Sequence, residues 1–64
     1  MAKFEIYSFD INSKTVVEAQ GIAEAMFDYL PWNTLNVTIE WIPSSGVYNV
    51  IDNQTDFKYK VKPE

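Results

Sequence analysis

Residues 35–41, "LNVTIEW", alternate between apolar and polar side chains over their whole length. In an extended chain successive side chains point to opposite faces, so one side of this stretch is apolar and the other is polar. The apolar members are Leu35, Val37, Ile39 and Trp41. This pattern predicts a β-strand with one buried face, and it requires the rest of the chain to supply both a sheet and a cover for that face.

Other stretches also have strand-like composition. "KFEIYSF", over about residues 3–9, alternates and is rich in aromatic and branched residues, which predicts a first strand. After residue 41, "PSSG" suits a four-residue hairpin loop, "VYNVID" a strand, "DNQT" a turn and "FKYKV" a last strand. The three lysines near the end of the chain suit a strand at the edge of the sheet, where charge discourages pairing with another molecule.

Residues 14–30, "KTVVEAQGIAEAMFDYL", fit either one long helix or a short strand followed by a helix. We favour the second interpretation. Residues 15–17 are β-branched and therefore start helices poorly. Gly21 would cost about 1 kcal/mol inside a helix but is tolerated near the N-cap. After it, an apolar stripe recurs at helical spacing, formed by Ile22, Met26, Tyr29 and Leu30. Pro31 ends the helix.

These elements predict one α+β domain over residues 1–64. Its order is ββαβββ, and one helix packs on an antiparallel sheet of four to five strands in two layers. The residues expected to meet in the core are Met26, Tyr29, Leu30, Val37, Ile39 and Trp41. The second face of the sheet is expected to be partly open and to show Tyr7, Tyr48, Val50, Glu5, Thr38, Glu40 and the lysines.

The residue types present argue against catalysis. The 64 residues include no cysteine and no histidine, which excludes disulfides, thiolate metal sites and the usual nucleophilic triads. Both glycines are isolated, so no phosphate-binding loop is present, and "DNQTD" lacks the glycine and the terminal glutamate of a calcium loop. We therefore expect a protein that is not an enzyme and that has no metal and no cofactor.

Charge is spread unevenly along the chain. Residues 1–57 carry two lysines and eight acids, while residues 58–64 carry three lysines and one acid, and arginine is absent. Without arginine or an evident basic patch, no direct nucleic-acid binding is expected. Membrane binding is not expected either, because the polar side of the helix is acidic. The N-terminus lacks the apolar region of a signal peptide, which predicts a cytoplasmic protein.

Protein binding remains as the expected function. Aromatic residues are enriched at interface hot spots, and acids around them speed encounter with a basic partner. The candidate partner-binding residues are Glu24, Asp28, Trp32, Phe27, Glu40, Tyr7 and Tyr48. Two interpretations of the acids stay open, since they either imitate the phosphates of a nucleic acid or only provide solubility. The alternative function is self-association as a homodimer through the open sheet face.

The opening "MAKFEIYSF", the passage "VVEAQGIAEAM" and the closing meander together resemble small, acidic accessory proteins of bacteriophages. The motif-like part is "VEA" at residues 17–19 followed by "IAEA" at residues 22–25. The resemblance implies a binder that inhibits a host enzyme or a host defence component in the host cytoplasm. It implies no particular target and assigns no functional residue. A self-associating accessory protein without inhibitory activity is the alternative.

Overall fold

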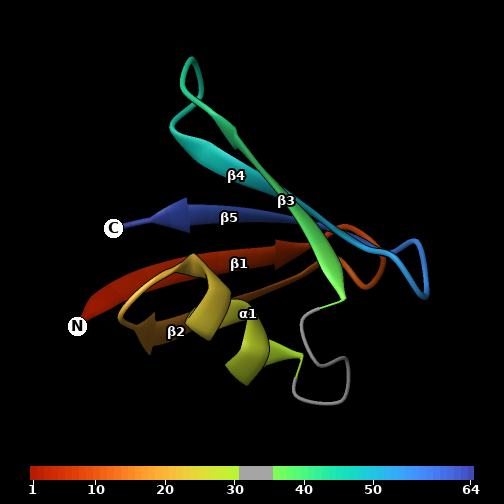
Figure 1. Cartoon of the computed structure of the whole chain (residues 1–64), viewed down its shortest axis with the longest axis horizontal. Helices are drawn as coiled ribbons and strands as arrows, with labels where there is room; N and C mark the ends of the chain where they lie inside the picture. Colours follow the sequence, from red (N-terminus) through yellow and green to blue (C-terminus); the bar gives the residue numbers. More distant parts are fainter. Residues whose placement is uncertain (31–35) are drawn as a thin grey trace.

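The computed structural model describes residues 1–30 and 36–64. Within them the chain forms a five-stranded antiparallel sheet and one short helix, in the order ββαβββ that the sequence predicts (Figure 1). The elements are β1 (Ala2–Ser8), β2 (Ser13–Ala19), α1 (Ile22–Tyr29), β3 (Val37–Ile42), β4 (Val47–Asp52) and β5 (Lys58–Pro63). The described part of the chain is therefore mostly sheet, with a single helix.

The strands lie side by side in the order β2-β1-β5-β4-β3. The first and last strands of the chain are thus neighbours, with Ile6 opposite Val61, and the Glu64 N–H donates to the Lys3 carbonyl at 2.8 Å. The expectation that the lysine-bearing last strand is an edge is wrong, because β5 occupies the centre of the sheet. Turn signals predict which consecutive strands pair, but they carry no information on the pairing that joins the two ends of a chain.

The second interpretation of residues 14–30 is confirmed. Residues 13–19 form β2, and Gly21 is the N-cap of α1, with extended backbone and its carbonyl accepting from the Ala25 N–H at 3.0 Å. Leu30 is the C-cap and donates to the Met26 carbonyl at 2.8 Å. An isolated helix of eight residues is unstable, so α1 depends on packing against the sheet. No helix in residues 1–30 or 36–64 is long and apolar enough to cross a membrane.

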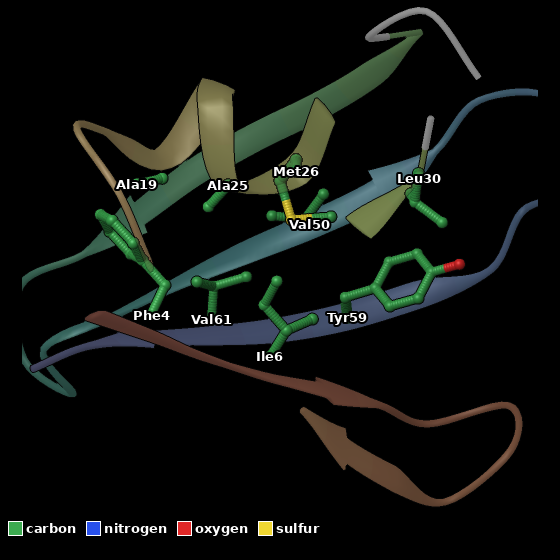
Figure 2. Packing of buried hydrophobic residues seen from close by; sticks show 9 residues of the cluster. All are labelled: Phe4, Ile6, Ala19, Ala25, Met26, Leu30, Val50, Tyr59 and Val61. Carbon is green, nitrogen blue, oxygen red and sulfur yellow. The ribbon is translucent and has the colours of Figure 1, made fainter. Parts of the chain in front are cut away.

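The core lies between α1 and one face of the sheet. Figure 2 shows Ile6, Val61 and Tyr59 pointing from the strands toward the helix segment. The buried cluster consists of Phe4, Ile6, Ala19, Ala25, Met26, Leu30, Val50, Tyr59 and Val61. Met26 and Leu30, from the predicted helical stripe, are at most 3% exposed. Burying a side chain of this size is worth about 1.5–3 kcal/mol, so this cluster supplies much of the stability of so small a domain.

Three expected positions are wrong, all on the β3–β4 hairpin. Trp41 was expected in the core and is 46% exposed, whereas Val50 was expected on the open face and is fully buried. Tyr48 lies on the same side as Val50, directly opposite Val61 and Trp41. The physical reason is lateral placement: α1 makes its main contacts with β2, at the other edge of the sheet from β3, so Trp41 extends beyond the helix. Figure 1 shows this hairpin extending away from α1.

The connections between paired strands use the turn residues that the sequence places there. Asn12 in the β1–β2 turn and Gly46 in the β3–β4 loop have positive φ, which asparagine and glycine tolerate best. In the β4–β5 turn the Asp52 carboxylate accepts from the backbone N–H groups of Gln54 at 2.8 Å and Thr55 at 3.4 Å. Asp52 is only 1% exposed, so this turn is held by a buried carboxylate.

Candidate functional site

The outward side of α1 carries Glu24, Phe27 and Asp28, which we call the acidic helix face. All three side chains are exposed, because Ala25 and Met26 take the inward positions of the same turns. Residues three and four apart are neighbours on a helix, so Glu24 is a neighbour of both Phe27 and Asp28. The ring is 46% exposed. Three of the seven predicted partner-binding residues are therefore brought together on one small surface.

This face is poorly suited to helix stability. Glu24 and Asp28 are like charges four residues apart, an arrangement that costs about 0.2–0.5 kcal/mol. Asp28 also stands in the last turn, where the helix dipole favours a cation, and no basic residue is present there. Exposing the Phe27 ring adds apolar surface that α1 does not need for its own packing. The composition of the face is thus not the one that helix stability alone would favour.

An apolar pocket of about 270 Å³ opens beside the C-terminal end of α1, and we call it the end pocket. It is lined by Ser8, Ile11, Tyr29, Leu30, Phe57 and Tyr59. Ile11 is 68% exposed although it is large and apolar. The sequence did not predict this pocket, because Ile11 falls in the predicted turn and Phe57 in the predicted last strand. An apolar residue within the turn cluster "DINS" was the available signal.

The end pocket has an aromatic floor. The rings of Tyr29 and Tyr59 meet edge to face with centroids 5.6 Å apart. Burial raises the pKa of the Tyr59 phenol above its ordinary value of 10.0, and the nearby Tyr29, Asp52 and Asp10 raise it further. The phenol therefore stays uncharged into the alkaline range, which suits an apolar occupant.

A second aromatic surface lies on β3 and β4. Trp41 and Tyr48 are directly opposite each other, with ring centroids 4.7 Å apart. They share the side of the sheet on which α1 packs but stand beyond the helix. Tyr48 thus contributes to the helix side of the molecule, together with Trp41, which was expected to be buried.

The remaining predicted site residues are placed elsewhere. Tyr7 and Glu40 lie on the opposite face of the sheet from α1, because they alternate with the inward residues of β1 and β3. Trp32 lies outside the described residues. The structure therefore divides the predicted set between two sides of the molecule, and it does not form one continuous site from all seven residues.

The open sheet face, meaning the side turned away from α1, gathers the positive charge of the chain. The strand registers place there all five basic residues of the sequence, which are Lys3, Lys14, Lys58, Lys60 and Lys62. Three glutamates of the strands share this face, namely Glu5, Glu18 and Glu40. Glu5 lies 3.7 Å from the Lys14 ammonium, a surface ion pair worth at most about 1 kcal/mol. The acidic helix face and the lysines are thus on opposite sides.

Two aromatic rings accompany these lysines. Tyr7 and Phe9 meet edge to face with centroids 4.9 Å apart, and the Tyr7 hydroxyl donates to the Asn12 side-chain oxygen. Phe9 is 54% exposed and lines a shallow hollow of about 300 Å³ with Asn49, Val50, Ile51, Lys58 and Tyr59. Phe9 was not among the predicted site residues, although the predicted strand over about residues 3–9 included it and its alternation with Tyr7 indicated this face.

Within the part of the chain that the structure describes, no three histidine, cysteine, aspartate or glutamate side chains are grouped to hold a metal ion. Comparison with protein families, with curated proteins and with solved structures finds no match to this chain. No activity or partner is therefore transferred from a relative, and the chemistry of the two sides of the sheet carries the functional argument.

Proposed function

We propose that this protein is a small protein-binding module that docks on a basic surface of a partner through its acidic helix face and end pocket. One observation carries the proposal. The exposed side of α1 presents two carboxylates and an exposed phenylalanine with no cation among them, while every lysine lies on the other side of the sheet. The carboxylates of such a surface attract a cationic partner, and the exposed Phe27 ring provides an apolar side chain for the partner to bury.

The outer side of α1 is smaller than the area that a stable protein complex buries. A stable complex buries about 800 Å² on each partner, against 4130 Å² of accessible surface for this chain. An eight-residue helix is only about 12 Å long, so its outer side is too small by itself. The end pocket and the Trp41–Tyr48 pair lie on the same side of the sheet and extend the apolar area. We expect a partner with lysine or arginine residues around an apolar side chain that enters the end pocket.

In this proposal the fold works as a two-layer α+β platform, in which the sheet supports the short helix from behind. The resemblance to bacteriophage accessory proteins supports a role as an inhibitor that covers a working surface of a host protein in the host cytoplasm. That function needs no catalytic group, because occupation of the partner's surface is sufficient.

The test uses the tagged protein to capture partners from nuclease-treated bacterial lysate. The variant Glu24→Lys/Asp28→Lys reverses the charge of the acidic helix face. The matched control Glu18→Lys/Glu64→Lys makes the same change in net charge at exposed positions away from α1. We expect stoichiometric capture of one basic protein by the wild type and the control, and at least ten-fold weaker binding by the helix variant when the partner is purified and titrated.

Light scattering on the purified protein completes the test. A monomer that captures a partner in the expected pattern supports the proposal. A dimer that captures nothing contradicts it and favours the alternative of self-association, in which exposed apolar residues such as Trp41 are buried against a second copy. Equal loss of binding in the helix variant and the control also contradicts the proposal, because the acids would then act only through net charge.

A further inference from the structure

We propose that the open sheet face binds single-stranded nucleic acid, through a site that is independent of the acidic helix face. The site, which we call the ring site, consists of Tyr7, Phe9, Lys14, Asn49, Lys58 and Lys60. The absence of arginine and the negative net charge argued against nucleic-acid binding at the level of the sequence. That argument averages charge over the chain, whereas the fold places every lysine on one face.

The arrangement of the ring site follows from the strand registers. Lys14, Tyr7, Lys60 and Asn49 lie side by side in one row across β2, β1, β5 and β4. Lys58 is two residues from Lys60 on the same face of β5, about 7 Å along the strand. Lys14 and Lys60 therefore flank Tyr7 on its two sides, and Lys58 extends the positive charge along β5. Such a track of cations can follow a phosphate backbone.

The rings give the site its second property. Phe9 is 54% exposed, and its hollow of about 300 Å³ combines apolar walls with the Asn49 amide and the Lys58 stem. Exposed rings beside cationic side chains on an open antiparallel sheet allow bases to stack while the phosphates contact the lysines. The edge-to-face contact with Tyr7 holds the Phe9 ring in place, so its orientation does not have to be selected on binding.

The acids on this face leave the ring site positive. Glu5 offsets the charge of Lys14, with which it forms an exposed ion pair that a phosphate can replace. Glu18 and Glu40 stand on the two edge strands, β2 and β3, with Glu18 opposite Lys3 and Glu40 at the far end of the row that contains Tyr7. Asp10 also lies beside β5, and its carboxylate accepts from the Lys58 backbone N–H at 3.1 Å.

Single strands fit this site better than other anionic partners. In a duplex the base faces are stacked inside and cannot reach Phe9. An acidic peptide would use the lysines but would leave the exposed ring and the hollow without a function. A membrane surface would favour a larger apolar area than the exposed side chains of Phe9, Val16 and Ile51 provide.

The test measures fluorescence anisotropy of a labelled oligo(dT) of about 12 nucleotides, within the range of site sizes for small single-strand binders. We expect a dissociation constant of about 10⁻⁵ M at 50 mM salt, with a slope of log K against log salt of about −2 for three lysine–phosphate contacts. Phe9→Ala should weaken binding about ten-fold, and Phe9→Tyr, which keeps the ring, should restore it.

Charge variants separate the ring site from general attraction. Lys60→Gln should weaken binding and reduce the salt slope by about 0.7, whereas Lys3→Gln, which removes the same charge at the far end of β1, should leave binding nearly unchanged. Circular dichroism of each variant checks that the fold is kept. Duplex DNA of the same length should bind more weakly than the single strand.

Several outcomes would overturn the proposal. One is no change in anisotropy at about 10⁻⁴ M protein in 50 mM salt. Another is displacement of the oligonucleotide by poly-glutamate as efficiently as by unlabelled oligo(dT) at equal charge, which would identify a site for anionic proteins. Binding to phosphatidylserine vesicles without binding to the oligonucleotide would identify a membrane surface. Unchanged affinity of Phe9→Ala would remove the stacking ring from the site.

Discussion

Asp52 shows how much of this fold depends on single side chains. Its buried carboxylate accepts from two backbone N–H groups of the β4–β5 turn. These donors would otherwise need other partners, and a buried donor left without an acceptor costs about 1–3 kcal/mol. A core of this size provides a net stability of roughly 3–5 kcal/mol, so the turn controls a large share of the total.

We therefore predict that Asp52→Ala lowers the free energy of unfolding by about 1–3 kcal/mol, measured by urea denaturation followed through tryptophan fluorescence. Asp52→Asn keeps a side-chain oxygen in the same position and should lose clearly less. Equal destabilisation by the two substitutions would mean that charge, and not the acceptor in the turn, is what the fold requires.

At the residue scale some features of the fold are readable from the sequence and others are not. The turn "DNQT" indicates a side chain that accepts from the backbone, but it does not indicate that the carboxylate is buried. The face of the sheet on which Tyr48 and Val50 lie can be deduced from the length of the preceding loop. A four-residue loop over 43–46 places Trp41 opposite Tyr48, and directly opposite residues of an antiparallel pair share a face. Loop length therefore predicted that Tyr48 and Val50 lie on the side of Trp41 and Ile39.

Among the elements, α1 combines a stable inner side with an unfavourable outer side. The inner side was predicted from the spacing of its apolar residues, and the burial of Met26 and Leu30 confirms it. The part of the sheet that the helix covers was not predictable, because periodicity shows which side of a helix is apolar but not which strands it meets. That choice depends on the central position of β5, which moves β3 and its Trp41 away from α1.

We predict that Asp28→Lys raises the stability of the protein by about 1 kcal/mol while weakening the binding of a basic partner. The substitution removes the repulsion with Glu24, creates an attractive pair at i, i+4 and places a cation at the negative end of the helix dipole. Thermal and urea unfolding measure the stability, and titration of the captured partner measures the affinity.

Glu64→Lys is the matched control, since it makes the same change in charge at an exposed position outside the helix. It should change stability by less than about 0.5 kcal/mol. A loss of stability in Asp28→Lys would contradict the view that Asp28 is kept for binding at the expense of the helix.

At the scale of the whole molecule, the first strand of the sheet, β1, pairs with the last, β5. β1 and β5 lie side by side, and the first residues of β1 stand next to the last residues of β5 (Figure 1). Termini that are this close tolerate being joined, provided that the new ends open an exposed connection that no buried side chain holds. The fold class and the order of elements were predictable from local patterns, whereas this closure was not, because it joins segments that are most distant in the sequence.

We predict that a circular permutant with residues 64 and 1 joined by a short glycine-serine linker folds when its new ends lie between Ser44 and Ser45. The same permutation opened between Gln54 and Thr55 should be destabilised, because it cuts the turn that Asp52 holds. Circular dichroism and urea midpoints compare the two. Equal stability of the two permutants would contradict the role assigned to this turn.

The central place of β5 also has a consequence for synthesis. Within the described sheet, β5 is the strand that connects β1 and β2 to β4 and β3. It also follows the other described strands in the sequence, so during synthesis the β1–β2 and β3–β4 hairpins are not joined in one sheet until residues 58–63 have been added. A chain that ends before residue 58 therefore lacks the strand that unites the two hairpins in one sheet.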